Sequence, residues 1–456
     1  MPVLPGSGPR SRELYVAIRK LIETGQASPG TKLPTTRDLA QRLGLSRAAA
    51  VAAFEMLVAD GFTEARVGSG TFVSTVVPTI ATAPPVSVLP RSQRALPCEL
   101  GVATIDQKTM AIFRRLLSRS LLRPGPEHFH YGDSRGGPAV REAIAAYLRT
   151  ARGVRCDAEQ IIVTTGTMHG MNLVVRAMLV PGDEAWIEDP CYMTARAVLE
   201  SIGARVIGIP VDREGLDAER GEELAPRARL AYVTPSHQFP LGVPMTMRRR
   251  LALLDWAKRR NAWIIEDDYD SEYRFAGAPL TALQGMDGAE RVVYLGTFSK
   301  VLFPGIRIGY AVVPKALLPR IVALRGFFDR QPPTLAEAAV AEFLDGGHFA
   351  AHLRRTRRRV EAGRDALLEA LACHAAGALS VMAPDQGLHL VAGLGDNRDD
   401  SAVASRLVAA GVGAKALSPM YLDLPPRQGL VLGFSGFDGA TLAAAAATIG
   451  GVLSKS

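Results

Sequence analysis

The sequence predicts a multidomain protein with a small N-terminal α+β domain, a large α/β domain and a smaller C-terminal α+β lobe. Three short helical patterns followed by a hairpin pattern occupy residues 10–76. A proline-rich stretch without amphipathic period follows at 77–97, which is typical of an extended linker. From about residue 160, apolar strand-like runs alternate with helical segments, the pattern of a mostly parallel sheet covered by helices.

Length and composition narrow the class of protein. The chain has 456 residues, 48% of them hydrophobic, and a net charge of +8. That excess is consistent with a polyanionic partner but does not identify one. The cysteines are widely scattered and include no C-x-x-C pair, so neither a disulfide framework nor a zinc knuckle is expected. No leader pattern opens the sequence, and the apolar stretch 439–453 is too short to span a membrane. We expect a cytoplasmic protein with no membrane partner.

Capping residues divide the first 60 residues into three helices. Apolar residues at helical spacing predict a first helix that ends near Gly25. Thr35 is expected to cap a short second helix ending at Gly44, and Ser46 a third ending at Gly61.

A hairpin completes the N-terminal domain. Residues 62–67 and 71–74 alternate like strands, and Gly-Ser-Gly at 68–70 separates them. The order helix, helix, turn, helix, hairpin is that of a winged helix-turn-helix, which we place at 10–76. The linker is placed at 77–97 and the larger domain at 98–456.

The third helix is the expected recognition element. In a helix-turn-helix, the second helix of the motif enters the major groove of DNA with its first turn facing the bases. Arg47, in that turn, can bind a guanine or a phosphate through two hydrogen bonds. The expected DNA contacts are Thr36, Arg37, Ser46, Arg47, Arg66, Gly68 and Gly70. The alternative is a helical dimerisation domain whose arginines are only solvated.

Two strings in this domain resemble the GntR family of bacterial transcription regulators. They are LPTTRDLAQRLGLSR at 33–47 and GSGTFV at 68–73. The resemblance implies double-stranded operator DNA as a partner. One departure is Ala49, followed by Ala50, where the family usually has Thr-Val, so a hydroxyl that could contact the DNA is missing.

The larger domain contains nine predicted strands. They are expected at 161–164, 185–188, 205–210, 230–234, 263–267, 292–295 and 307–313, and, in a lobe covering about 346–456, at 387–392 and 429–434. Open parallel sheets bind ligands at the carboxyl ends of their strands, and polar strings follow several of these runs.

The string GTFSKVLFPGIRIGY at 296–310 has the chemistry that pyridoxal 5'-phosphate requires. Lys300 can form a Schiff base with an aldehyde, while neighbouring hydroxyls and Arg307 hold a phosphate. The cofactor also needs a carboxylate at its pyridine nitrogen and a donor at its phenolate oxygen. Asp267 and Tyr269, at the end of a strand, can supply both, and Tyr192 can stack on the ring.

Residues 100–453 resemble the fold-type I aminotransferases. The resemblance implies an aldimine on Lys300, Asp267 at the pyridine nitrogen, with Asp268 as the adjacent alternative, and Tyr269 at the phenolate. The residues implied at the phosphate are Gly166, Thr167, Met168, Thr297, Ser299 and Arg307. Tyr131 matches a tyrosine that reaches the phosphate of the neighbouring subunit, which implies a homodimer.

A histidine pair and an arginine-rich run near the start of the C-terminal lobe do not by themselves indicate a binding site. His348 and His352 lie four apart but lack an intervening glutamate and a third ligand, so no metal site is expected. The arginines of 354–359 could meet DNA phosphates, but a solvated helix face is at least as plausible.

The combination of both domains resembles the MocR subfamily of GntR-type regulators. The strings PSHQFPLG at 235–242 and EDDYDSEYRF at 266–275 carry this resemblance. It implies a head-to-tail homodimer and a transcription regulator that senses an amine effector or a vitamin B6 vitamer through Lys300. Phe239 and Val431 stand where working aminotransferases usually have a phenolate-binding asparagine and a carboxylate-binding arginine. An active aminotransferase with an accessory DNA-binding domain is the alternative, and a cofactor-free repressor is a third interpretation.

Overall fold

The computed structural model describes residues 10–454 except 24, 67, 76–94, 123–124, 126–128, 278–279 and 396–397. The chain divides into two compact units, Met1–Arg91 and Ser92–Ser456, here called the head and the body. The predicted linker at 77–97 lies mostly outside the described residues. Among the residues described, no helix is long and apolar enough to cross a membrane.

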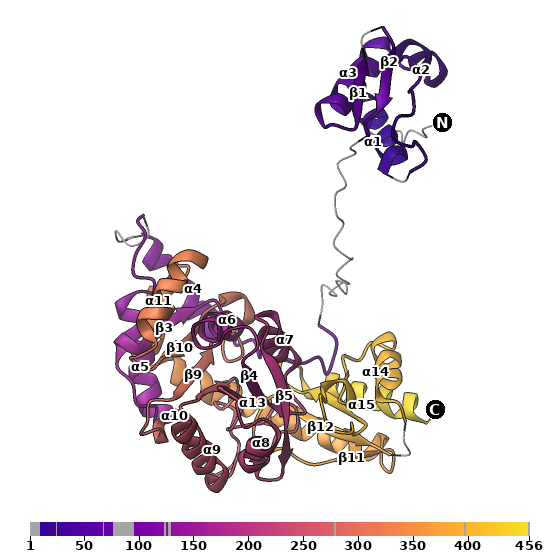
Figure 1. Cartoon of the computed structure of the whole chain (residues 1–456). Helices are drawn as coiled ribbons and strands as arrows, with labels where there is room; N and C mark the ends of the chain where they lie inside the picture. The colour runs from indigo at the N-terminus through magenta and orange to yellow at the C-terminus, as the bar shows by residue number, and fades with distance from the viewer. Residues whose placement is uncertain are drawn as a thin grey trace. The chain divides into compact units, whose positions relative to one another are not determined.

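The head has the predicted winged helix-turn-helix fold (Figure 1). Its elements are α1 (Arg10–Glu23), α2 (Thr36–Leu43), α3 (Arg47–Ala59), β1 (Thr63–Arg66) and β2 (Gly70–Val73). The predicted caps are confirmed, since the Thr35 and Ser46 side chains accept hydrogen bonds from the amides of Asp38 and Ala49 at 3.1 and 3.2 Å. Gly44 ends α2 with a left-handed φ of 61°, a conformation that glycine adopts without strain.

The body is built on an eight-stranded sheet in the order β3-β10-β9-β8-β7-β4-β5-β6. Its strands are β3 (Ile161–Thr164), β4 (Glu184–Asp189), β5 (Arg205–Asp212), β6 (Gly215–Leu216), β7 (Leu230–Val233), β8 (Trp263–Asp268), β9 (Val292–Thr297) and β10 (Gly309–Val312). The pairs within β9-β8-β7-β4-β5 are parallel, which confirms the prediction of a mostly parallel sheet. β10 is antiparallel to both β3 and β9. A short loop therefore joins β9 to β10, and this loop carries Lys300.

Helices cover both faces of the sheet. Ile265 and Val293 pack on one face with residues of α6 and α7, whereas Ile264 and Val292 pack on the other with α8 and α9. Side chains alternate along a strand, so burial on both faces explains the continuous apolar runs in the sequence. The helices of the body are α4 (Gln107–Leu122), α5 (Pro138–Arg152), α6 (Thr167–Met178), α7 (Met193–Ser201), α8 (Ala218–Leu224), α9 (Met247–Arg260), α10 (Leu283–Met286), α11 (Leu318–Phe328) and α12 (Glu337–Asp345). Single turns of 3-10 helix lie at Ala158–Gln160, Pro304–Ile306 and Ser418–Met420.

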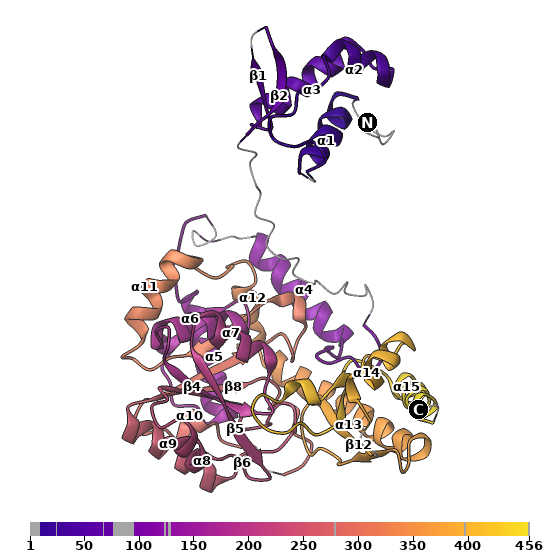
Figure 2. The same cartoon turned by 45° about the vertical axis from the view of Figure 1, so that its right-hand side comes forward.

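The C-terminal lobe contains a four-stranded antiparallel sheet in the order β11-β12-β14-β13. Figure 2 labels β12 of this sheet together with the helices of the lobe. Its elements are α13 (His348–His374), β11 (Leu379–Val381), β12 (His389–Leu394), α14 (Asp400–Ala409), β13 (Lys415–Ala416), β14 (Gly429–Gly433) and α15 (Gly439–Leu453). The predicted strands of the lobe correspond to β12 and β14. Three short strands were not predicted from the sequence: β11 and β13 in the lobe and β6 in the main sheet.

Candidate cofactor site and nucleic-acid interface

Asp267 lies at the carboxyl end of β8. One of its carboxylate oxygens is hydrogen-bonded and the other is not. Its Oδ2 accepts a hydrogen bond from the Tyr232 hydroxyl at 2.6 Å. Its Oδ1 is buried and has no hydrogen-bond partner among the described residues. A buried acceptor of this kind is costly unless a donor reaches it. The N–H of a protonated pyridine ring is such a donor, so Asp267 fits the predicted cofactor.

The adjacent Asp268 is used differently. Side chains alternate along β8, so Asp268 points to the opposite face of the sheet from Asp267. There its Oδ2 accepts hydrogen bonds from Arg152 at 2.8 Å and from the Tyr294 hydroxyl at 2.6 Å. The Asp268 Oδ1 is also buried without a partner in the described part of the chain, so the two aspartates differ in their other oxygen. That of Asp268 belongs to a buried ion pair with Arg152, which favours Asp267 for the pyridine nitrogen.

Lys300 is half-buried in the loop after β9. A Cβ added to Gly101 would collide with the Lys300 ammonium nitrogen, so the glycine leaves the space that the ammonium uses. Gly101 also has a φ of 78°, where a side chain would be strained. Burial raises the pKa of Asp267 to about 7, while the Tyr232 hydrogen bond and the Lys300 charge act in the opposite direction. The Lys300 charge therefore acts on the Asp267 carboxylate.

The predicted phosphate residues meet at the ends of β3, β9 and β10. Gly166 precedes the first turn of α6, and a Cβ added to it would lie 3.4 Å from an Arg307 nitrogen. Ser299 has a buried Oγ without a partner in the described part of the chain, and its amide donates to Thr297 Oγ1 at 3.1 Å. A helix N-terminus, a guanidinium and an unused hydroxyl are suitable ligands for a phosphate. Thr167 and Met168 occupy the first turn of α6, half-buried.

Two further aromatic residues were predicted at the cofactor. Tyr192 packs edge-on against Phe239 with ring centroids 5.4 Å apart, and Phe239 packs in the same way against Tyr269 at 6.1 Å. Tyr131 is 76% exposed, with the Arg330 guanidinium 4.6 Å from its ring centroid. Its role in a neighbouring subunit stays a prediction.

The surroundings of Val431 are apolar. Val431 is fully buried on β14 in a cluster with Leu417 and Met420, against which Phe239 also packs. Arg427, which could have replaced the missing carboxylate-binding arginine, is exposed and donates to the Tyr421 hydroxyl at 3.2 Å. The apolar cluster at Val431 therefore supplies no guanidinium for a substrate carboxylate.

The raised pKa of Asp267 leads to a prediction about the cofactor-free protein. An unfolded aspartate ionises near pH 4, but burial holds the pKa of Asp267 at about 7 in the folded chain. The folded state thus binds more protons between these values, and Asp267 lowers stability progressively as the pH rises through this range. Asp267→Asn should therefore raise the unfolding temperature, relative to wild type, more at pH 8 than at pH 5. Thermal unfolding at a series of pH values measures this difference, and a constant difference would refute the shift.

The predicted DNA contacts lie on the exposed side of the head. Arg37 and Arg47 are exposed in the first turns of α2 and α3. The Arg66 guanidinium lies 4.7 Å from the Phe72 ring centroid on the hairpin. Further predicted contacts are Thr36, Ser46, Gly68 and Gly70, of which Gly68 and Gly70 have φ values of 76° and 108°. The Ser46 oxygen caps α3, so its hydroxyl can still donate to a phosphate.

The arginine-rich part of α13 bonds largely within the chain. Arg355 donates to Asp106 at 2.6 Å and Arg357 to the Glu272 carbonyl at 2.9 Å. Both arginines are half-buried, so the interpretation as a solvated face is wrong for these two. On the same helix, both ring nitrogens of His352 form hydrogen bonds, to the Thr109 hydroxyl and the Val301 carbonyl.

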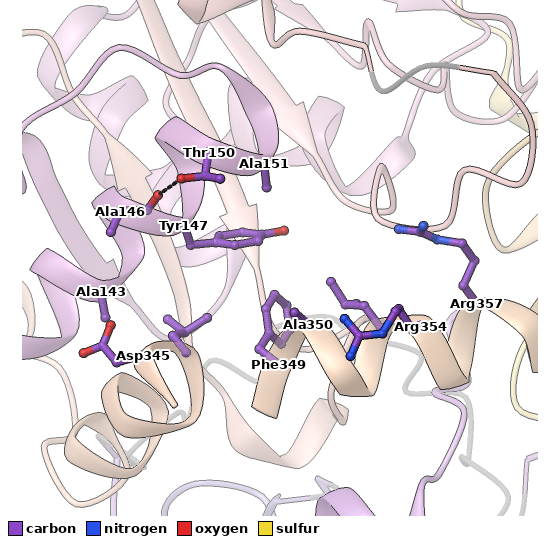
Figure 3. Close-up of a pocket in the computed structure, with 12 residues that line it drawn as sticks. Ala143, Ala146, Tyr147, Thr150, Ala151, Asp345, Phe349, Ala350, Arg354 and Arg357 are labelled. Atoms are coloured by element: carbon purple, nitrogen blue, oxygen red, sulfur yellow. Dashed lines mark hydrogen bonds between the residues drawn. The ribbon is translucent and has the colours of Figure 1, made fainter. Parts of the chain in front are cut away.

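A pocket of about 400 Å³ lies between α5, α12 and α13 (Figure 3). Its lining includes the rings of Tyr147 and Phe349, which pack edge to face at 5.1 Å, and the side chains of Arg354 and Arg357. In the described part of the chain, no predicted cofactor residue lines it. The pocket is thus distinct from the candidate cofactor site.

Several residues that contact the candidate cofactor site or the predicted DNA-binding residues of the head were not predicted from the sequence. Tyr232, Arg152 and His237 contact Asp267, Asp268 and Tyr269 respectively. Lys32, which precedes α2, pairs with Phe72 of the hairpin, and its ammonium lies 5.8 Å from the Phe72 ring centroid. A signal existed for Tyr232, since it is the one hydroxyl-bearing residue in the apolar strand β7. The others required knowledge of the tertiary contacts.

Two family models match the chain. Residues 10–73 match the model described as bacterial regulatory proteins, gntR family. Residues 107–430 match aminotransferase class I and II. The first covers the head and the second most of the body.

Curated relatives and solved structures agree with these matches. A probable rhizopine catabolism regulatory protein, MocR, from Rhizobium meliloti is 38% identical over 95% of this chain and 92% of its own length. The pyridoxine biosynthesis transcriptional regulator PdxR from Corynebacterium glutamicum is 32% identical over 94% of this chain and 93% of its own. The crystal structure of a Pyrococcus horikoshii kynurenine aminotransferase covers 79% of this chain and 91% of its own, with a TM-score of 0.73 and 26% identity.

The similarity to regulators spans both units, and the fold similarity covers the body. Since the head has the winged helix-turn-helix fold and the body the aminotransferase fold, both predicted resemblances are confirmed. The chain belongs to the MocR-type transcriptional regulators of the GntR family, which join a helix-turn-helix domain to an aminotransferase-like domain.

Proposed function

We propose that this regulator binds pyridoxal 5'-phosphate at Lys300 and uses it to sense an amine effector or a vitamin B6 vitamer. The cofactor would supply an aldehyde that reacts with amines. Asp267 would hold the pyridine nitrogen in its protonated form, and Arg307 and Ser299 would bind the phosphate. Binding of an effector would change the affinity of the two heads of a dimer for operator DNA.

The unused Oδ1 of Asp267 carries this proposal. It is buried and has no donor among the residues described, and the charge of Lys300 lowers the pKa of the same carboxyl group. The unused Ser299 hydroxyl and the Arg307 guanidinium beside Gly166 lie around the same strand ends. An aminotransferase-like body that had lost its cofactor would be expected to fill such positions with internal partners, because unpaired buried polar groups cost stability.

Active transamination is the second candidate function. The body is 26% identical to a solved kynurenine aminotransferase, and the lysine, aspartate and tyrosine needed for such chemistry are present. However, Val431 lies in an apolar cluster, and losing a paired guanidinium for a carboxylate costs on the order of 2 kcal/mol in binding. Incubation of the purified protein with an amino donor and a keto-acid acceptor separates the candidates. We expect no sustained turnover, and sustained turnover would contradict a purely sensory role.

A homodimer is part of the proposal. Tyr131 is exposed on its own subunit, and the tyrosine that it resembles reaches the phosphate of the neighbouring one. A head-to-tail pair of bodies would let each Tyr131 complete the other subunit's site. A dimer would also present two heads to two half-sites of DNA.

Arg47→Ala should weaken operator binding without affecting the cofactor. Arg47 is exposed at the start of the recognition helix α3, and losing a base or phosphate contact costs about 1–3 kcal/mol, or roughly 5- to 150-fold in affinity. The measurement is fluorescence anisotropy with a DNA fragment from upstream of the protein's own gene, at physiological salt.

Arg12→Ala is the matched control for this experiment. Arg12 is exposed on α1 of the same head and is not among the predicted contacts, so its replacement removes the same charge elsewhere. We expect it to bind DNA nearly as wild type does. Equal losses in both variants would mean that Arg47 contributes only net charge.

A further inference from the structure

A buried hydrogen-bonded chain leads from Asp270 through His237 to Tyr269. The His237 Nδ1 lies 2.8 Å from Asp270 Oδ2 and 3.0 Å from the Tyr269 hydroxyl oxygen. The side chains of His237 and Asp270 are each 1% exposed. Water therefore does not compete for the contact between His237 and Asp270, whereas Tyr269 is half-buried. The three groups set each other's hydrogen-bonding roles.

The Asp270 carboxylate determines which nitrogen of the His237 ring carries the proton. Burial raises the pKa of Asp270, and the contact with His237 opposes that rise by favouring the ionised form. An ionised carboxylate only accepts hydrogen bonds, so beside it the facing nitrogen, Nδ1, carries the proton. The Tyr269 oxygen lies beside that same nitrogen, so the single Nδ1–H is shared between Asp270 and Tyr269. The Tyr269 oxygen accepts from it and cannot donate to it. The hydroxyl proton of Tyr269 is consequently left to point at another acceptor.

Packing holds the His237 ring in this orientation. A Cβ added to Gly387 would overlap the ring, and one added to Gly242 would lie 3.1 Å from Nε2. The ring of His389 lies 5.2 Å away, and its own Nε2 is hydrogen-bonded to the Pro240 carbonyl at 2.9 Å. His237, Asp270 and His389 also lie close enough to share a cation. The His237 Nδ1 and the His389 Nε2 are hydrogen-bonded as described, whereas the His237 Nε2 is buried without a partner among the described residues.

Tyr269 keeps its proton in this environment. Burial raises the pKa of its hydroxyl well above the usual value, and the charges of Asp270, Asp267, Glu188 and Asp268 raise it further. Phe239 stands where related aminotransferases place an asparagine at the cofactor phenolate, and it offers no side-chain donor. Tyr269 is therefore the side chain available to donate at that position.

We propose that His237, oriented by Asp270, is a positioning residue that directs the Tyr269 hydroxyl proton to the phenolate oxygen of pyridoxal phosphate. This inference rests on the cofactor binding proposed above. The negative phenolate oxygen stabilises the protonated form of the nitrogen that would join the cofactor to Lys300. A hydrogen-bond donor at the phenolate weakens that stabilisation and so would lower the pKa of the nitrogen. Loss of the donor raises the pKa.

The experiment is a pH titration of the visible absorbance of the full-length, cofactor-loaded protein. Tyr269→Phe should raise the pH midpoint by about one unit, and His237→Leu should raise it by about half a unit, as expected for loss or weakening of one hydrogen bond. His237→Asn should restore the wild-type midpoint, because its amide nitrogen can donate to both Asp270 and Tyr269. His389→Leu, which alters the neighbouring ring, should leave the midpoint unchanged.

Asp270→Asn provides a second test that retains the imidazole. Without the carboxylate, Nδ1 can accept the Tyr269 proton, so the midpoint should rise as in His237→Leu. An unchanged midpoint in His237→Leu and Asp270→Asn, together with a raised one in Tyr269→Phe, would overturn the inference. A wild-type protein that shows no cofactor band would instead contradict the proposed function, so the two failures are distinguishable.

Discussion

Lys300→Ala should abolish covalent attachment of pyridoxal phosphate. Lys300 lies in the loop between β9 and β10, beside Gly101 and facing the charge of Asp267, and its amine is the one that the proposed site uses. Wild-type protein incubated with the cofactor and reduced with borohydride should carry the pyridoxyl group on the peptide that contains Lys300. The variant should carry none there and should lose the pH-sensitive visible absorbance. Mass spectrometry and absorbance measure both effects.

Lys315→Ala is the matched control. Lys315 is 63% exposed and paired with Asp157 at 3.4 Å, so it represents an ordinary surface lysine. It should retain covalent cofactor at the wild-type level. Equal labelling of the Lys300→Ala protein and the wild type would refute the assignment of Lys300, since the cofactor would then be attached elsewhere.

Arg152→Ala should lower the free energy of unfolding more than any other variant proposed for this protein. The Arg152 guanidinium donates to Asp268 at 2.8 Å, to the Leu280 carbonyl at 2.7 Å and to the Ser236 hydroxyl at 2.9 Å. Its removal leaves the Asp268 carboxylate buried without its cation. Breaking a buried ion pair in this way costs about 3–5 kcal/mol, which chemical denaturation of the body can measure.

Two further variants test the cause of this loss. Arg149 lies less than one turn before Arg152 on α5, is exposed, and donates to the Cys156 carbonyl. Arg149→Ala should therefore lower the free energy of unfolding by about 1 kcal/mol or less. Adding Asp268→Asn to Arg152→Ala should recover part of the stability, because the uncompensated charge is removed. If the double variant is as unstable as Arg152→Ala, the loss comes from packing and not from charge.

Local features of the fold could be predicted from the sequence. Thr35 and Ser46 cap helices through atoms three residues away, so the necessary information lies in neighbouring positions. The antiparallel direction of β10 could not be predicted, because it depends on pairing with β3, which is remote in sequence. The two- and three-residue strands β6, β11 and β13 were missed since they are too short to show an alternating pattern.

The candidate site was predictable in composition but not in arrangement. The residue types around Lys300 and Asp267 indicated the cofactor because its chemistry requires an amine, a carboxylate and phosphate ligands. The spacing to Lys300 and Tyr269 favoured Asp267 over the adjacent Asp268, but the sequence does not tell which face of β8 meets Lys300. The structure separates them through Tyr232 on one face and Arg152 on the other. The partners of Tyr269 likewise became visible only with the fold, because His237 is brought to it from a different loop.

In the proposed mechanism, the chemistry at Lys300 controls the binding of DNA by the head. The most direct measurement is the affinity of the full-length protein for its upstream DNA, with and without added pyridoxal phosphate, in the wild type and in Lys300→Ala. We predict that the cofactor changes the wild-type affinity by roughly fivefold or more, a typical coupling between two sites, and leaves the variant unchanged. An equal response of both proteins, or none in the wild type, would contradict the claim.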